Sequence, residues 1–225
     1  MSSWLNHRKK ELPKAISVWL NSRPTAGNII LKMEAKLKLV IFDLDGTVVE
    51  NSYDWPAIRK ELGIPGGSIL AYLESLPEPE RSAKYALLQK FEKEQTENSV
   101  LKEGVREFLD WLGRTGVKKA LVTNNSLDNT RHLLEKFDLK FDLVLTRESG
   151  LHKPAGTPFL KVMKHFGVKP EETAVVGDTS YDFLAAREAG ISRVFILKSN
   201  MTSAGLEGAE IVEKFEQIKN KLSEK

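Results

Sequence analysis

The fold is decided by one stretch of sequence, Leu39-Val40-Ile41-Phe42-Asp43-Leu44-Asp45-Gly46-Thr47. It begins with an apolar run of strand length, and two carboxylates follow where that strand would end. Gly46 and Thr47 then supply the glycine and the hydroxyl of a tight turn. The stretch therefore predicts a buried strand whose exit carries a site able to hold a metal ion, attack phosphorus and pass a proton.

Further apolar runs along the chain share this short length and the same content of Val, Ile, Leu and Phe, which is typical of strands covered on both faces. We predict strands over 38–42, 120–123, 143–145, 173–176 and 194–197. Helical patterns lie between them, over 105–112, 128–137, 158–166 and 181–189. The glycines expected to end three of these helices are Gly113, Gly167 and Gly190. This alternation predicts an α/β fold, a parallel sheet with helices on both faces.

The alternation is interrupted once, after the first strand. Helical patterns over 55–62, 69–76 and 79–97 fill this part of the chain, with no convincing strand among them. An insertion at this point lies above the carboxyl ends of the strands, where such folds bind ligands. We therefore predict a small all-helical cap over 50–100 and an α/β core over 37–49 and 101–225. Hinges near 49–51 and 99–102 would let the cap open and close.

The remaining part, residues 1–36, is predicted to be an N-terminal extension, helical or disordered. Residues 1–38 hold eight Lys and Arg against two acidic residues, whereas the rest of the chain carries 26 basic and 29 acidic residues. The basic character thus belongs to the extension, and we expect no nucleic-acid partner. The extension lacks the apolar core of an export signal. A start of translation at Met33 stays an alternative.

The composition of the chain excludes further kinds of site and function. The 225 residues are 41% hydrophobic, as in a globular protein, and no apolar run is long enough to cross a membrane. The chain has no cysteine, which excludes disulfides, thiolate metal sites and cysteine nucleophiles and fits a reducing cytoplasm. No histidine cluster suggests a transition metal. A metal ion would therefore sit on oxygen ligands.

Polar residues stand where four of the predicted strands end. They are Asp43 and Asp45, then Thr123, Asn124 and Asn125, then Lys153, then Asp178 and Asp182. In a parallel sheet these ends point the same way, so the side chains are predicted to converge. Each has an ordinary alternative, such as a helix cap for Thr123 or a surface position for Lys153. Their common placement favours one site.

Four motifs stand in order along the chain, as DLDGT at 43–47, LVTNN at 121–125, HKP at 152–154 and GDTSYD at 177–182. With them the sequence resembles the haloacid dehalogenase superfamily, in its phosphatase branch with a helical cap after the first strand, as in phosphoglycolate phosphatases. The resemblance covers about residues 37 to 200. It implies a Rossmann-like core, a Mg²⁺ ion and hydrolysis of a phosphate monoester through an aspartyl-phosphate intermediate.

The resemblance also implies roles for the carboxylates. Asp43 would attack phosphorus, and Asp45 would protonate the leaving alcohol and then activate water. Mg²⁺ would be held by Asp43, by the main-chain carbonyl of Asp45 and by Asp178. Asp182 would bind the metal through water or orient Lys153.

The remaining motif residues would handle the phosphate. Thr123 and the backbone amide of Asn124 would hold its oxygens, and Lys153 would offset charge on the nucleophile and the transferring group. Supporting positions in the first turn are Gly46 and Thr47. Gly156 departs from the family pattern, since relatives often have proline there, and predicts a looser loop.

Other functions remain to be weighed against the phosphatase. The acid at Asp45 argues against the dehalogenase and ion-pumping branches. A phosphomutase of the β-phosphoglucomutase type stays open, because such relatives share the core residues. From another class, a non-catalytic phosphate-binding or receiver-like signalling domain is disfavoured by the order of the motifs and by the insertion.

The substrate is left open. We expect a small phosphorylated metabolite, with acids, sugars and nucleotides all possible and phosphoglycolate a guess from the family. Candidates to contact its leaving group are Tyr53, Trp55, Arg59, Arg81, Lys84 and His152. We predict a cytoplasmic monomer or homodimer without a membrane partner.

Overall fold

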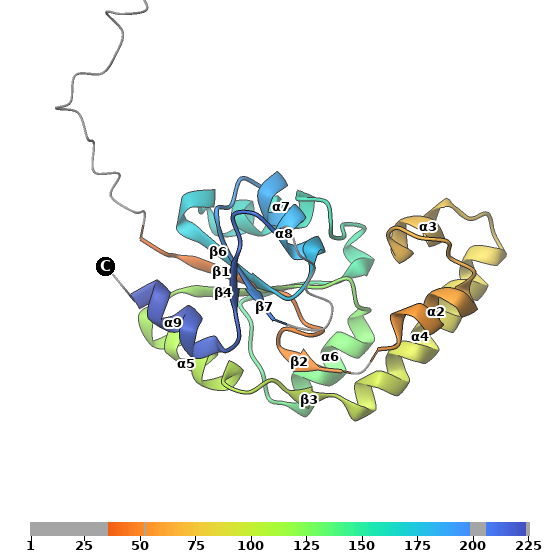
Figure 1. Cartoon of the computed structure of the whole chain (residues 1–225), viewed down its shortest axis with the longest axis horizontal. Helices are drawn as coiled ribbons and strands as arrows, with labels where there is room; N and C mark the ends of the chain where they lie inside the picture. Colours follow the sequence, from red (N-terminus) through yellow and green to blue (C-terminus); the bar gives the residue numbers. More distant parts are fainter. Residues whose placement is uncertain (1–35, 52, 199–205, 224–225) are drawn as a thin grey trace, which may run out of the picture. The chain divides into compact units, whose positions relative to one another are not determined.

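The computed structural model describes residues 36–51, 53–198 and 206–223. Nearly all of the predicted N-terminal extension, with the alternative start at Met33, lies outside the described residues. The described part is built on a six-stranded sheet, shown in Figure 1.

All six strands are parallel and follow the order β5-β4-β1-β6-β7-β8. Their bounds are β1 Leu39–Phe42, β4 Lys118–Val122, β5 Leu143–Leu145, β6 Thr173–Gly177, β7 Arg193–Leu197 and β8 Glu210–Val212. β1 lies between β4 and β6, and Phe42 is level with Leu121 and Val176. The carboxyl ends of these three strands therefore lie side by side. The predicted α/β class is confirmed.

Helices cover both faces of the sheet (Figure 1). One face packs against α5 Val105–Thr115, α6 Leu127–Lys136 and α9 Phe215–Ser223, and the other against α7 Thr157–Phe166 and α8 Ser180–Glu188. Val40 and Phe42 enter the first apolar cluster, and Leu39 and Ile41 enter the second. Because successive side chains of a strand alternate between faces, one apolar run serves both layers.

A second group of helices, here called the helical insertion, follows the first strand. It consists of α2 Trp55–Leu62, α3 Ile69–Ser75 and α4 Glu80–Asn98. Its helices share an apolar cluster of their own, formed by Ile58, Leu62, Ile64, Leu70, Leu73 and Leu88. The chain enters through β2 Val49–Glu50 and leaves through β3 Val100–Leu101, which pair antiparallel. The expectation of no strand here missed this pair because two residues are too few to show alternation.

The observed ends of the helices agree only in part with the predicted ends. Gly167 caps α7 with φ of 64°, in the left-handed conformation that glycine adopts without strain. The prediction that Gly113 ends α5 is wrong, since the helix continues to Thr115 and is capped by Gly116 at φ 73°. Among the described helices, none is long and apolar enough to span a membrane.

Candidate active site

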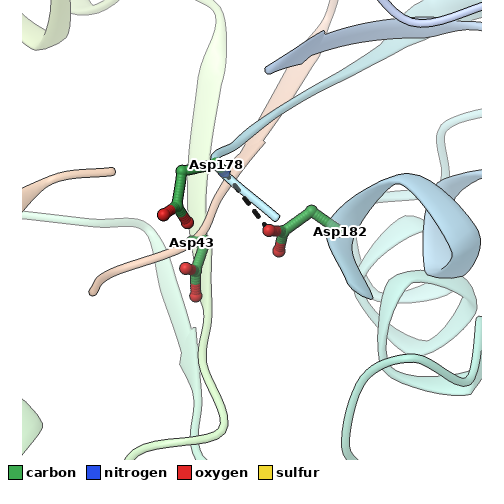
Figure 2. Close-up of side chains that lie close together, drawn as sticks. All are labelled: Asp43, Asp178 and Asp182. Atoms are coloured by element: carbon green, nitrogen blue, oxygen red, sulfur yellow. Dashed lines mark hydrogen bonds between the residues drawn. The ribbon is translucent and has the colours of Figure 1, made fainter. Parts of the chain in front are cut away.

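The ends of two strands and the first turn of one helix bring acidic side chains to one edge of the sheet. Asp43 follows β1 and Asp178 follows β6, while Asp182 lies in the first turn of α8. Figure 2 shows the three carboxylates close together, and one oxygen of each lies within 4.8 Å of the others. All three residues are buried.

Lys153 is buried among these carboxylates. Its Nζ lies 2.5 Å from Oδ1 of Asp43 and 2.6 Å from Oδ1 of Asp182. Burial alone would lower the pKa of Lys153, but the charges of Asp182 and Asp43 raise it above its ordinary value. The ammonium is therefore a fixed positive charge in the site.

The loop that carries Lys153 is held by Asn124. The Nδ2 of Asn124 donates to the carbonyl oxygen of Lys153 at 2.9 Å, and the amide of Lys153 donates to Oδ1 of Asn124 at 2.9 Å. This side chain thus positions the lysine loop, while the backbone amide of Asn124 was the group predicted to meet phosphate. Thr123 is buried, and its Oγ1 accepts a bond of 3.0 Å from the amide of Asn125.

Both carboxylate oxygens of Asp182 are engaged. Oδ1 faces Lys153, and Oδ2 accepts from the amide and hydroxyl of Thr179 at 3.1 and 2.9 Å and from the amide of Asp178 at 3.3 Å. The last of these bonds is dashed in Figure 2. Of the two predicted roles, the geometry favours the orientation of Lys153.

The remaining pair, Asp43 and Asp178, fits a hard divalent cation. Burial and then the charge of Asp182 raise the pKa of Asp178, to about 7. Burial also raises the pKa of Asp43 well above its usual range, although Lys153 lowers it. Such a pair of buried carboxylates gains from a positive charge between them, and an all-oxygen donor set suits Mg²⁺.

Gly46 allows the first turn to approach Asp178. Its φ is 82°, and a Cβ at this position would lie 2.2 Å from Oδ2 of Asp178. Thr47 donates from Oγ1 to Oδ1 of the same carboxylate at 3.4 Å. The supporting residues of the first turn therefore shape the surroundings of the predicted metal ligand.

The carboxylate of Asp45 is held by two asparagines. Nδ2 of Asn51 donates to Oδ1 at 2.6 Å, and Nδ2 of Asn125 donates to Oδ2 at 3.0 Å. Burial raises the pKa of Asp45, while the Asn125 bond and the charge of Lys153 lower it. Sequence reasoning did not assign a role to either asparagine. Asn125 stood within the LVTNN motif and could have been found, whereas nothing in the sequence singled out Asn51.

Two of the residues predicted to contact the leaving group, Tyr53 and Trp55, form an aromatic pair that is linked to Asn125. Burial and the charge of Asp45 raise the pKa of Tyr53, whose hydroxyl bonds to Asn125. The ring of Trp55 stacks on Tyr53 with 4.6 Å between centroids. This aromatic pair is thus connected to the carboxylate of Asp45 through Asn125.

The other candidates have different surroundings. Arg81 pairs with Glu78 at 2.8 Å on the surface, and Nζ of Lys84 donates to a carbonyl of α2 at 2.5 Å, so both support the insertion instead of reaching the site. His152 contacts Glu74 of α3 through Nε2 at 3.1 Å. Nη1 of Arg59 is buried without a hydrogen-bond partner among the described residues.

The sequence also did not predict a buried ion pair between the helical insertion and the core. Arg147, in the 3₁₀ helix η1 Arg147–Ser149, makes two bonds to Glu92 of α4, at 2.7 and 2.8 Å. Nothing in the periodicity of either segment indicates a partner 55 residues away.

The loop at Gly156 is crowded, so the prediction of a looser loop is wrong. A Cβ at Gly156 would lie 2.8 Å from the amide nitrogen of Ala189 and 3.0 Å from the carbonyl oxygen of Ala185. The amide of Gly156 donates to Glu188 at 2.8 Å. Glycine is needed here because α7 begins against the end of α8.

The family model of haloacid dehalogenase-like hydrolases matches residues 51–196. The chain belongs to this family. The match includes Thr123, Lys153 and Asp178. Asp43 and Asp45 precede it and are tied to the same site by the contacts described above.

One relative in sequence and two solved structures of similar fold are compared with the chain. The chain is 29% identical to the phosphoglycolate phosphatase of Aquifex aeolicus, over 72% of this chain and 85% of that protein. Its fold resembles CbbY from Rhodobacter sphaeroides, solved with phosphate, at a TM-score of 0.65 and 20% identity over 81% and 96% of the two chains. A structure from Thermotoga maritima named as a candidate β-phosphoglucomutase gives a TM-score of 0.60 at 24% identity, over 83% and 98%.

Proposed function

We propose that this hydrolase is a Mg²⁺-dependent phosphatase that cleaves a small phosphate monoester through an aspartyl-phosphate intermediate. The observation that carries the proposal is the contact of Lys153 with Asp43 at the end of β1, with Asp178 beside it and Asp45 two residues further on. The named phosphatases among the relatives support the reaction class. We propose the cytoplasm as its location.

In the first step Asp43 attacks phosphorus. Lys153 already occupies Oδ1, so we assign the attack to Oδ2. A bond forms between this oxygen and phosphorus, and the bond from phosphorus to the alcohol oxygen breaks. Asp45 gives its proton to that oxygen, and the raised pKa of Asp45 favours the protonated form that this role needs.

In the second step water cleaves the acyl phosphate. Asp45, now ionised, takes a proton from the attacking water, phosphate leaves, and the carboxylate of Asp43 is restored. Lys153 holds a positive charge against the transferring group in both steps, and Thr123, the residue after β4, would hold phosphate oxygens. When bound by Asp43 and Asp178, Mg²⁺ would supply further positive charge for the phosphate oxygens.

The test is hydrolysis of p-nitrophenyl phosphate with and without Mg²⁺. We expect turnover with Mg²⁺, a loss of more than about 1,000-fold in Asp43→Asn, and phosphate bound covalently to Asp43 after an acid quench. A panel of phosphorylated metabolites would then name the substrate. No hydrolysis of any compound in the panel would refute the phosphatase.

A phosphomutase is the second candidate, because the Thermotoga structure shares the fold. A hexose phosphate whose phosphate changes position without release would favour it. Net release of phosphate from the same compound would exclude it.

A further inference from the structure

The buried ion pair of Arg147 and Glu92 has the geometry of a carboxylate-binding site. Nη1 of Arg147 bonds to Oε1 of Glu92 at 2.7 Å, and Nη2 bonds to Oε2 at 2.8 Å. The two side chains are only 7% and 6% exposed. Two parallel bonds from a guanidinium are the arrangement by which arginine recognises carboxylates in general.

The pair is connected to Asp45 through Asn125. The charge of Arg147 lowers the pKa of Asp45, and the charge of Asp45 raises the pKa of Glu92. The amide of Arg147 also donates at 3.2 Å to the carbonyl of Asn125, the residue that holds Asp45. Since Asp45 would protonate the leaving oxygen, we place the groups attached to that oxygen on the side of these neighbours.

Stability alone gives a weak reason for the pair. Burial raises the pKa of Glu92 to about 7 even though Arg147 lowers it, so desolvation outweighs the attraction for this carboxylate. Buried ion pairs contribute little compared with apolar side chains of the same size. Here the arginine belongs to the core and the carboxylate of Glu92 to the helical insertion, so a change in the position of the insertion would break both bonds to Glu92. Glu148, on the core side, lies 3.8 Å from Nε of Arg147 and would stay beside the guanidinium.

We propose that Arg147 determines specificity by binding a carboxylate on the leaving alcohol, and that Glu92 occupies the same guanidinium when no such substrate is bound. The inference rests on the proposed phosphatase function, since Asp45 defines the leaving-group side. Binding exchanges one carboxylate for another at Arg147. A substrate with an uncharged leaving group would gain nothing from this exchange.

Two substrates that differ only in the last group of the leaving alcohol test the proposal. 2-Phosphoglycolate has a carboxylate where ethylene glycol monophosphate has a CH₂OH group. We expect kcat/KM for phosphoglycolate to exceed that for ethylene glycol monophosphate by about tenfold or more, because hydrogen bonds to a charged group contribute on this scale. The preference should fall in Arg147→Gln, and it should rise in Glu92→Gln, which removes the internal competitor. A purely structural ion pair predicts that both variants shift the preference equally or not at all, and that result would overturn the proposal.

Two controls keep the result interpretable. Arg81→Gln removes one positive charge from the surface of the same insertion and should leave the preference unchanged. Arg147→Lys keeps the charge without the two-bond geometry and should retain only part of the preference.

A binding experiment on the unchanged protein needs neither turnover nor a folded variant. Calorimetry with Mg²⁺ should show tighter binding of phosphonoacetate than of propylphosphonate, and equal affinities would contradict the role of Arg147. Failure of the phosphatase proposal looks different, because then no phosphate ester is hydrolysed at all.

Discussion

Nζ of Lys153 lies 2.5 Å from Oδ1 of Asp43, and both side chains are buried. Burial raises the pKa of Asp43 and Lys153 opposes this rise, so the lysine favours the ionised form of the nucleophile. Attack needs the ionised form, and activity should therefore rise with pH through the pKa of Asp43.

Lys153→Met removes this opposing charge. We expect kcat/KM to fall by roughly 100-fold to 1,000-fold and the acid limb of the pH profile to move to higher pH. Lys161→Met, at an exposed position of α7, is the control and should leave the profile in place. A fall in rate with an unchanged acid limb would show that Lys153 does not set the ionisation of Asp43.

Asn125→Ala removes a hydrogen bond that lowers the pKa of Asp45. The pKa of this acid should rise, so the alkaline limb of kcat/KM should move to higher pH, since proton donation is lost as pH rises through that pKa. The variant should lose about 1 kcal/mol of unfolding free energy. Asn98→Ala removes an exposed bond to Glu94 and should not move the limb.

Gly46→Ala tests the close approach of the first turn to Asp178. The new Cβ would meet Oδ2 at 2.2 Å, and the residue has a φ of 82°. We expect the variant to bind Mg²⁺ more weakly. We also expect its unfolding free energy, measured by chemical denaturation, to fall by more than about 2 kcal/mol. Gly150→Ala shares the positive φ, 70°, but has open space around its Cβ. The Gly150→Ala variant therefore measures the cost of backbone strain alone. An equal loss of unfolding free energy in both variants would mean that the clash with Asp178 contributes nothing.

Glu92 makes the stability of the protein depend on pH. Its pKa is raised from 4.5 to about 7, so the folded state holds this proton more tightly than the unfolded chain does. The contribution to the unfolding free energy therefore falls as pH rises from 4.5 to 7, by on the order of 3 kcal/mol. Glu92→Gln lacks this dependence. Urea unfolding of both proteins at several pH values measures the difference, and parallel curves would refute it.

Much of the sheet could be predicted because its strands are continuous apolar runs. β1 is buried at every residue and differs from the predicted strand only by Lys38. The last strand and helix, β8 Glu210–Val212 and α9 Phe215–Ser223, were not predicted. β8 exposes two of its residues at the edge of the sheet, so it has no long apolar run to recognise.

The convergence of Asp43, Lys153 and Asp178 followed from parallel topology, because strand ends share one edge whatever their distance in sequence. Their chemical roles stay predictions. The contacts of Glu92 with Arg147 and of Asn51 with Asp45 could not be predicted, because they depend on how the helical insertion docks.

The two ends of the helical insertion lie side by side, since Glu50 pairs with Val100 and Val49 with Leu101. The segment between them can in principle be cut out at neighbouring points and replaced by one of different length without shifting the register of the main sheet. Grafting the insertion of a relative onto this core would replace Glu92 and leave Arg147, the carboxylates of the site and Lys153 in place. The partner of the guanidinium could thus be exchanged without altering the groups proposed to carry the reaction.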